Sequence, residues 1–522
     1  MKALISRSMA AWAVILLSLF FSGGVSAEEK CSELISFEMP GTSLEITRAE
    51  KMAESISKPS PSGGYAGTLP AHCRIDGAID KRIGSDGKPY AIGFAITLPD
   101  SWNGRFLFQG GGGLNGSVRE PIGAATAGDQ PALAQGFAVV STDSGHQSDS
   151  AFDSSFFSDQ EASLNFLYKA IGKVTVVAKR IIREYYQSPP EYSYFVGCST
   201  GGREAMIMSQ RYPDYFDGIV AGAPAMRTNF SNLADRFVAV TLNQAAPADE
   251  NGKVVPGAGY SDQDKAFVVQ SFLDACDGYD GIEDGMVFNI QACGFDPLSF
   301  ICRSNAKENC LTAKQADVLK KAFAGPRDSR GHQVYPGFYF DTGIAASRGL
   351  PGLLNATSGP VGPPFTETTM DVDRASIQAA DAIAAVGDST WINLSTFSSG
   401  GGKLLFYHGV SDPWFSAKDT QEYYQKMAEE NGGVEKVLNW SRLYLGPGMG
   451  HCSGGEKALD TFNMLDAVVN WVEKDIAPDR IEATGRAFPG RSRPLCPFPE
   501  YAHYTGEGDP EDASNFECFL PD

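Results

Sequence analysis

Short apolar runs, each followed by small or polar residues, recur along the chain. Such runs span Arg105 to Phe108, Phe137 to Val140 and Tyr192 to Val196. Two more, at Ile219–Val220 and Leu404 to Tyr407, have the same form. Continuous apolar strands that end in functional loops are typical of a largely parallel sheet covered by helices.

Helical patterns separate these strands, notably from Ser163 to Tyr186 and from Arg203 to Tyr212. Alternating strands and helices predict an α/β fold. The pattern changes between residues 224 and 384, which hold long Gly/Pro-rich loops and few strand-like runs. We therefore predict a core made of residues 28–223 and 385–522, with a lid domain, residues 224–384, inserted between its two parts.

The first residues have the pattern of a secretory signal. Lys2 and Arg7 precede an apolar run from Met9 to Phe21, and small residues follow at positions 25 to 27. A membrane anchor would need about 20 apolar residues, and this run is shorter. We predict a signal peptide over residues 1–27 and a secreted or periplasmic protein.

Charge and export narrow the functional classes. The 522 residues include 63 Asp and Glu against 43 Lys and Arg, a formal net charge of −20. This charge has the wrong sign for nucleic acid or an anionic membrane as partner. Export argues against cosubstrates that are scarce outside the cell, such as nucleoside triphosphates and nicotinamides. The ten cysteines can form disulfides in an oxidising compartment.

The sequence around Ser199 matches the nucleophile elbow G-x-S-x-G. Residues 197–201 read Gly-Cys-Ser-Thr-Gly and lie between a predicted strand and a predicted helix. A chance turn is the alternative, but the tight strand-to-helix turn requires small neighbours. It would also aim the N–H of Thr200 at a developing oxyanion.

A serine nucleophile needs a base and an acid that orients the base. In α/β-hydrolases the chain order is Ser, acid, His, and the last two follow late strands. His451, in Gly-Met-Gly-His-Cys, and Asp412, which follows the Leu404 to Tyr407 run, fit these roles. His408 at the strand end is interpreted as structural, and His146 precedes Ser199 and could only line the site.

A cluster of glycines follows the first apolar run. Residues 111–116 satisfy G-x-G-x-x-G, which is typical of dinucleotide sites, but Pro121 interrupts the helix that should follow. A glycine-rich loop can instead supply the second oxyanion donor. We take Gly111 and Gly112 as candidates, and the pattern leaves the choice among residues 110–113 open.

Two cysteines adjoin the predicted nucleophile and base. Cys198 precedes Ser199, and Cys452 follows His451. If Ser199 and His451 meet, the two cysteines come within the usual Cα separation of a disulfide, roughly 4.4–6.8 Å. They could also be two ordinary buried thiols. A disulfide would hold nucleophile and base in register.

Gly-Cys-Ser-Thr-Gly-Gly, the Asp412 loop and Gly-His-Cys together resemble the tannase and feruloyl esterase family. The resemblance covers roughly Cys31 to Cys518 and implies an α/β-hydrolase core with a large inserted lid. It also implies a Ser199, Asp412 and His451 triad. The disulfides that the resemblance implies are Cys31–Cys73, Cys198–Cys452, Cys276–Cys293, Cys302–Cys310 and Cys496–Cys518.

An acidic loop in the predicted lid carries Asp277, Asp280 and Asp284 among glycines. Hard oxygen ligands on a turning loop suit Ca²⁺, although the spacing is not that of an EF-hand. A solvated acidic turn is the alternative. The resemblance implies a structural calcium ion held by these three aspartates and by the carbonyls of Ile282 and Met286.

The resemblance implies a secreted serine esterase that acts on a small aromatic ester, free or attached to plant polysaccharide or polyphenol. Thr200 is the residue usual in the phenolic-ester branch, so feruloyl or other hydroxycinnamoyl esters are expected first. Gallate esters or mono(2-hydroxyethyl) terephthalate are alternatives. Trp414 and Phe415 are candidate substrate walls or core residues, and Arg374 could pair with a substrate carboxylate or be a surface charge. A catalytically silent protein that binds phenolics or carbohydrate is the alternative from another class, and the triad alone would also suit a peptidase.

Overall fold

A nine-stranded mixed sheet forms the centre of the computed structural model, which describes residues 27–57, 67–123, 130–303, 309–346, 350 and 365–521. Most of the predicted signal peptide, residues 1–26, lies outside the described residues. The strand order is β1-β4-β5-β7-β6-β8-β9-β10-β11. These strands span Leu44–Met52 (β1), His72–Ile83 (β4), Pro89–Pro99 (β5), Arg105–Gln109 (β6), Ala138–Thr142 (β7), Tyr192–Cys198 (β8), Gly218–Gly222 (β9), Lys403–Gly409 (β10) and Ser441–Gly446 (β11).

The parallel part of the sheet is the part that the apolar runs predict. Strands β7, β6, β8, β9, β10 and β11 pair parallel to one another, whereas β1, β4 and β5 pair antiparallel at the amino-terminal side. Successive side chains of a strand point to opposite faces. Phe106 and Phe108 of β6 accordingly belong to one core cluster and Leu107 to another.

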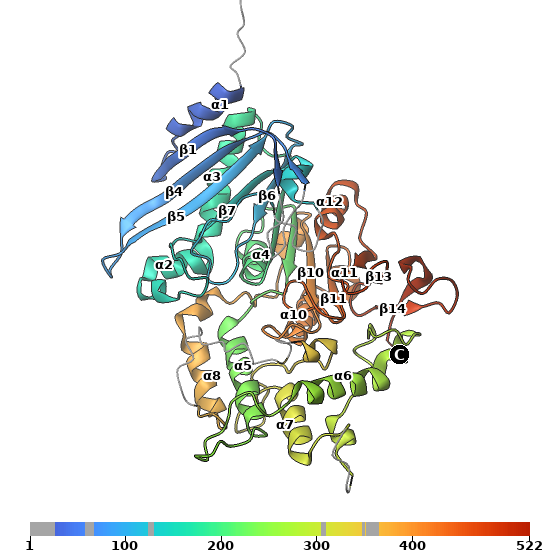
Figure 1. Ribbon diagram of the computed structural model, residues 1–522. Coiled ribbons are helices and arrows are strands. Elements are labelled where there is room, and N and C mark those ends of the chain that lie inside the picture. The colour runs from blue at the N-terminus through green and yellow to red at the C-terminus, as the bar shows by residue number, and fades with distance from the viewer. Residues whose placement is uncertain are drawn as a thin grey trace, which may run out of the picture.

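Helices cover both faces of this sheet (Figure 1). Helices α3 (Ala170–Tyr186), α4 (Thr200–Arg211) and α10 (Ala417–Glu430) contribute to the first core cluster, and α12 (Met464–Lys474) contributes to the second. A short π-helical turn, Asn165–Lys169, joins α2 (Gln160–Leu164) to α3. The predicted helix from Ser163 to Tyr186 therefore exists with one interruption. Among the described residues no helix is both long and apolar enough to cross a membrane.

Residues 224–384, which we call the inserted segment, lie between β9 and β10 in the chain. Their four longest helices gather at one end of the sheet in Figure 1. Side chains of α5, α6 and α7 pack into a hydrophobic cluster separate from those of the sheet. The helices are α5 (Thr228–Asn243), α6 (Asp262–Cys276), α7 (Ala313–Ala324) and α8 (Val372–Asp381).

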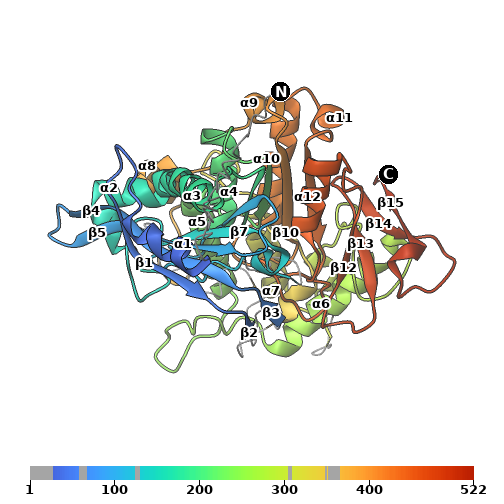
Figure 2. The same cartoon turned by 90° about the horizontal axis from the view of Figure 1, so that it is seen from above.

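Smaller elements complete the chain at its periphery. In the view of Figure 2 the amino-terminal strands lie at one side of the molecule and the carboxyl-terminal hairpins at the other. The remaining strands are β2 (Ser55–Ser57), β3 (Gly67–Leu69), β12 (Ile481–Thr484), β13 (Ser492–Leu495), β14 (Tyr501–Tyr504) and β15 (Phe516–Phe519). The remaining α-helices are α1 (Ala27–Glu33), α9 (Ser395–Ser399) and α11 (Val434–Val437).

Candidate active site

Ser199 occupies the sharp turn between β8 and α4. Its φ of 65° and ψ of −122° are unusual for a residue with a side chain. The turn is held by the Ser199 N–H, which donates to the Gly222 carbonyl at 3.0 Å. The elbow also requires glycine, because a Cβ on Gly197 would lie 2.5 Å from the backbone of Gly201. These features are those of a nucleophile elbow.

The predicted acid and base are hydrogen-bonded to each other. Asp412, in the loop after β10, places Oδ2 2.7 Å from Nδ1 of His451, in the loop after β11. Asp412 Oδ1 accepts from the N–H groups of Trp414 at 2.9 Å and Phe415 at 3.1 Å. The acid is therefore fixed on both oxygens and can orient the imidazole.

The Asp412 carboxylate is buried and stays ionised. Burial alone would raise the pKa of Asp412, but the His451 charge and the hydrogen bonds of His408 and His451 lower the pKa below its usual range. A buried carboxylate in this state stabilises an imidazolium at His451.

His408 contacts the acid, which the sequence did not indicate. Its Nε2 lies 3.3 Å from Asp412 Oδ2 and 2.9 Å from the carbonyl oxygen of Phe415. Because a carbonyl only accepts, the proton of the neutral ring resides on Nε2, and Nδ1 accepts from the Thr420 hydroxyl at 2.8 Å. His408 is fully buried and braces the loop that carries Asp412.

A disulfide joins the elbow to the histidine loop. Cys198 and Cys452 are bonded, with their Cα atoms 5.9 Å apart. His451 Nε2 is buried and makes no hydrogen bond with the described residues. No hydrogen bond yet joins it to Ser199, and such bonds commonly tighten only when substrate binds. The disulfide keeps the two residues in neighbouring positions.

The amides of the two glycines expected as oxyanion donors are already hydrogen-bonded to side chains. The Gly111 N–H donates to Glu204 Oε2 at 2.8 Å, and the Gly112 N–H donates to Asn115 Oδ1 at 2.8 Å. Both amides are thus engaged, and Gly111 and Gly112 stay a prediction as oxyanion donors. The Gly113 carbonyl accepts from the Thr200 hydroxyl, so Gly113 adjoins the elbow. Its N–H makes no hydrogen bond to the described residues, and this free N–H makes Gly113 a further candidate donor beside Thr200.

A buried polar network fixes this glycine loop. Glu204, on α4, is buried and accepts from Gly111, from Asn115 Nδ2 at 2.8 Å and from the Ser144 hydroxyl at 3.1 Å. Asn115 in turn holds Gly112. Glu204 lies five residues after Ser199, on the helix that follows the elbow. An acidic residue at a core-facing position of this helix was the sequence signal that could have identified it.

Aromatic side chains border His451. The ring centroids of Trp414 and Phe415 lie 4.8 Å and 5.3 Å from that of His451. Both residues are half-buried, so they adjoin the base and remain partly accessible. Arg374, on α8, is exposed and is not hydrogen-bonded through its guanidinium to any described residue.

His146 does not join the triad. It is buried, its ring stacks on Phe156 with the centroids 3.8 Å apart, and both of its nitrogens lack hydrogen-bond partners among the described residues. Burial lowers the pKa of His146 to about 4, which keeps the ring neutral.

The acidic loop offers a partial cation site. Asp277 Oδ1 and Asp280 Oδ1 are buried and accept no hydrogen bond from the described residues. Burial, with the nearby Asp284 charge, raises the pKa of Asp280 to about 8 and also raises that of Asp277. Asp284 is instead paired with Arg493 and Arg491. Across the described ranges, no group of three or more His, Cys, Asp or Glu side chains is arranged as a metal site. The donors fit a cation at Asp277 and Asp280, while the arginines occupy Asp284.

Five disulfides are present, and they are the pairs that the resemblance implies. All ten cysteines take part in them. Besides the bond at the elbow they are Cys31–Cys73, Cys276–Cys293, Cys302–Cys310 and Cys496–Cys518.

Comparison with known proteins finds relatives that match most of the chain. Residues 73–361 and 361–519 match the family model described as tannase and feruloyl esterase. The chain is 35% identical to mono(2-hydroxyethyl) terephthalate hydrolase from Piscinibacter sakaiensis over 88% of this chain and 87% of that protein. It is 28% identical to a probable feruloyl esterase from Arthroderma benhamiae over 97% of both.

A solved structure resembles the whole fold. Feruloyl esterase B from Aspergillus oryzae superposes with a TM-score of 0.79 and 25% sequence identity. The match covers 95% of this chain and 100% of that one. The mixed sheet with its covering helices is therefore an α/β-hydrolase fold.

Proposed function

Since the chain belongs to the tannase and feruloyl esterase family of carboxylic ester hydrolases, we propose that it is a secreted serine esterase of aromatic esters. Feruloyl and other hydroxycinnamoyl esters are its first substrates, free or attached to plant polysaccharide or polyphenol. The observation that carries the proposal is the Asp412–His451 pair, joined through the Cys198–Cys452 disulfide to the elbow of Ser199.

In this mechanism the Ser199 hydroxyl attacks the ester carbonyl while His451 Nε2 takes its proton. The Asp412 carboxylate stabilises the resulting imidazolium through Nδ1. The N–H groups of Thr200 and Gly113 donate to the tetrahedral oxyanion. The C–O bond to the alcohol then breaks, and His451 returns the proton to the leaving alcohol.

The acyl-enzyme is hydrolysed by the same groups in reverse. His451 deprotonates a water molecule that attacks the acyl carbonyl, a second tetrahedral oxyanion forms, and Ser199 leaves with the proton from His451. Atoms balance as one ester and one water converted into one carboxylic acid and one alcohol. The Cys198–Cys452 bond contributes by limiting the relative movement of nucleophile and base.

The aromatic preference is supported by residues beside the base. Trp414 and Phe415 lie against the His451 ring and are proposed to contact the acyl group. Thr200, next to the nucleophile, is the residue expected for phenolic esters. The relative from Piscinibacter sakaiensis, named for mono(2-hydroxyethyl) terephthalate, supports that monoester as a second candidate substrate.

The experiment is to measure release of ferulate, gallate and terephthalate from their model esters by the wild type and by Ser199→Ala. We expect ferulate release by the wild type that is lost in the variant. Faster release of gallate or terephthalate than of ferulate would change the assigned acyl group of the substrate and leave the proposed mechanism unchanged. Turnover of none of them, or equal turnover by Ser199→Ala, would refute the esterase and favour a binding protein.

Secretion is proposed from the amino-terminal pattern and from the disulfides, which persist in oxidising compartments. Expression in a bacterial host, followed by fractionation and amino-terminal sequencing, should place a chain that begins at Glu28 outside the cytoplasm. A cytoplasmic protein that keeps its first residues would contradict export.

Calcium is proposed as a structural ion of the acidic loop. Asp277 and Asp280 would hold it, with Asp284 and the carbonyls of Ile282 and Met286, and the ion would supply charge neutralisation away from the chemistry. Elemental analysis after dialysis without chelator should find about one calcium per chain. Absence of calcium would leave the loop as an acidic turn.

A further inference from the structure

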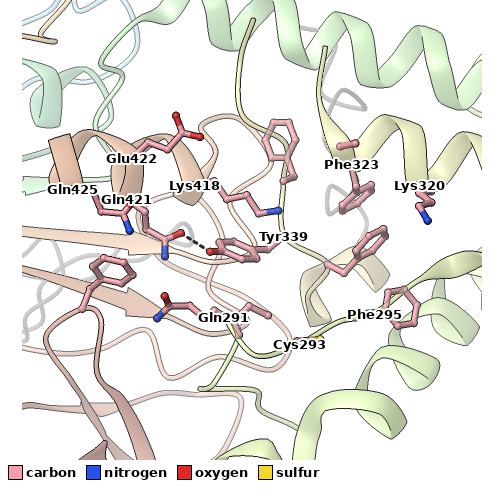
Figure 3. A pocket seen from close by; sticks show the side chains of 15 residues that line it. Gln291, Cys293, Phe295, Lys320, Phe323, Tyr339, Lys418, Gln421, Glu422 and Gln425 are labelled. Carbon is pink, nitrogen blue, oxygen red and sulfur yellow. Dashed lines mark hydrogen bonds between the residues drawn. The ribbon is translucent and has the colours of Figure 1, made fainter. Parts of the chain in front are cut away.

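A cavity of about 580 Å³ lies between the inserted segment and α10, and we call it the rear cavity. The inserted segment supplies Phe295, Phe323 and Tyr339 to its wall, and α10 supplies Lys418 and Gln421 (Figure 3). The triad residues are not among those that line it. Its volume lies within the range of small-molecule sites, about 300–1,000 Å³.

One end of the rear cavity is a wall of aromatic rings. Phe323 and Phe340 are stacked with centroids 4.3 Å apart and an interplanar angle of 7°. Phe295 meets Phe340 edge to face at 5.0 Å. All three line the cavity, so this end offers apolar aromatic surface on which another flat ring can pack.

The wall of the cavity also carries a cation that forms no ion pair within the described part of the chain. Lys418 lies with its ammonium 4.5 Å from the centroid of the Tyr339 ring. Its ammonium makes no ion pair or hydrogen bond with any residue that the structure describes. Its position in the partly buried wall lowers the pKa of Lys418 through desolvation, which the Glu422 charge partly offsets. An anion beside the ammonium would stabilise its charged form and offset the cost of desolvation.

The other charged side chains of the wall are already compensated. Lys320 donates to Asp296 at 2.7 Å, and Glu422 pairs with Lys426 at 3.6 Å. The Tyr339 hydroxyl donates to Gln421 Oε1 at 2.6 Å, the contact drawn in Figure 3. That bond fixes both side chains and leaves the Gln421 amide nitrogen without a hydrogen bond to the described residues.

We propose that the rear cavity is a second binding site, separate from the triad, for a planar aromatic carboxylate. Its ring packs on the Phe295, Phe323 and Phe340 wall, and its carboxylate pairs with Lys418. A single uncompensated cation beside apolar walls suits a monoanion with a flat apolar body and does not suit a phosphate, which needs more donors. The choice of aromatic acid, as the kind of product the enzyme releases, rests on the proposed function.

The test measures binding of cinnamate and of its neutral isostere cinnamamide by calorimetry. The protein is first treated with phenylmethylsulfonyl fluoride, and mass spectrometry verifies that Ser199 is blocked, so that the catalytic site does not contribute. We expect one equivalent of cinnamate to bind and cinnamamide to bind at least about tenfold more weakly, because the ion pair is lost. No cinnamate binding, or equal binding of the amide, would overturn the proposal.

Charge variants locate the site. Lys418→Gln should weaken cinnamate binding by about tenfold, whereas Lys320→Gln, whose charge Asp296 already neutralises, should change it less than about twofold. Gln425 is an exposed lining residue, so Gln425→Glu and Gln425→Lys should fold and should shift affinity in opposite directions. Unchanged affinity in both Lys418→Gln and the Gln425 pair would place the ligand elsewhere and refute the assignment.

Failure of this proposal is distinguishable from failure of the proposed function. Ester hydrolysis and Ser199 labelling report on the triad, whereas binding to the blocked protein reports on the rear cavity. Hydrolysis without binding refutes only the second site. Binding without hydrolysis supports the cavity and refutes the esterase.

Discussion

Asp341 of the inserted segment links both loops that carry the acid and the base. It is buried, and its Oδ2 accepts from the Ser411 hydroxyl at 2.6 Å and from the Gly448 N–H at 2.7 Å. Ser411 precedes Asp412, and Gly448 lies three residues before His451. Removing this carboxylate by Asp341→Ala should therefore loosen the Asp412–His451 pair.

The magnitude follows from the groups left without a partner. The Ser411 hydroxyl, the Gly448 N–H and the Thr342 N–H lose a charged acceptor, at about 1–3 kcal/mol each, so the free energy of unfolding should fall by about 3–9 kcal/mol. Asp341→Asn keeps one acceptor oxygen and should cost about half as much. If the variant destabilises the transition state by about 1.4 kcal/mol, kcat falls about tenfold. KM should change little, because Trp414 and Phe415, which are proposed to contact the substrate, remain in place.

The assay combines urea unfolding with kcat and KM on methyl ferulate. The matched control is Asp419→Asn, which breaks the ion pair of Arg227, the residue before α5, with Asp419 of α10. The Asp419 side chain makes no hydrogen bond to the loops that carry Asp412 and His451. The control should lose stability and keep kcat. The reasoning is refuted if Asp341→Ala, still folded at the assay temperature, has the same kcat as the control.

Three further predictions concern the brace, the disulfide and a buried carboxyl. His408→Phe should lower kcat about tenfold by freeing the Phe415 carbonyl and Asp412, and steady-state kinetics with kcat equal to the wild type would contradict the brace. Replacing Cys198 and Cys452 by alanine should lower the free energy of unfolding by about 4–5 kcal/mol, since the bond closes a loop of 254 residues; an unchanged urea midpoint would contradict this. Burial, only partly offset by the Gly145 and Gly93 N–H groups, raises the pKa of Asp143 to about 7, above its unfolded value of about 3.9. Stability should thus be greatest below about pH 4 for this group and be lost as the pH rises to about 7, by up to about 1.4 kcal/mol per pH unit. Asp143→Asn should remove that slope, and a slope equal to the wild type would show that other groups cause it.

The parallel half of the fold and the elbow at Ser199 were predictable because local sequence determines them. An apolar run followed by Gly-Cys-Ser-Thr-Gly requires a strand, a tight turn and a helix, whatever surrounds them. The antiparallel strand β1 has one buried residue, β4 alternates buried and partly exposed residues, and both carry charges, so no continuous apolar run marked them.

Contacts between distant segments account for what the sequence did not indicate. Consecutive glycines are equivalent in sequence, and only the acceptors Glu204 and Asn115 distinguish Gly111 and Gly112 from Gly113. The Asp341 contacts join positions 70 and 107 residues apart. No local sequence pattern indicates these contacts, because the packing of the inserted segment on the sheet determines which residues meet.

The central claim is that Ser199 carries the acyl group during turnover. Acid quenching of the enzyme during hydrolysis of an activated feruloyl ester, followed by peptide mass spectrometry, tests it directly. We expect one feruloyl group on the peptide that contains Ser199, and none in Ser199→Ala. A feruloyl group on another residue, or full turnover by Ser199→Ala, would contradict the account.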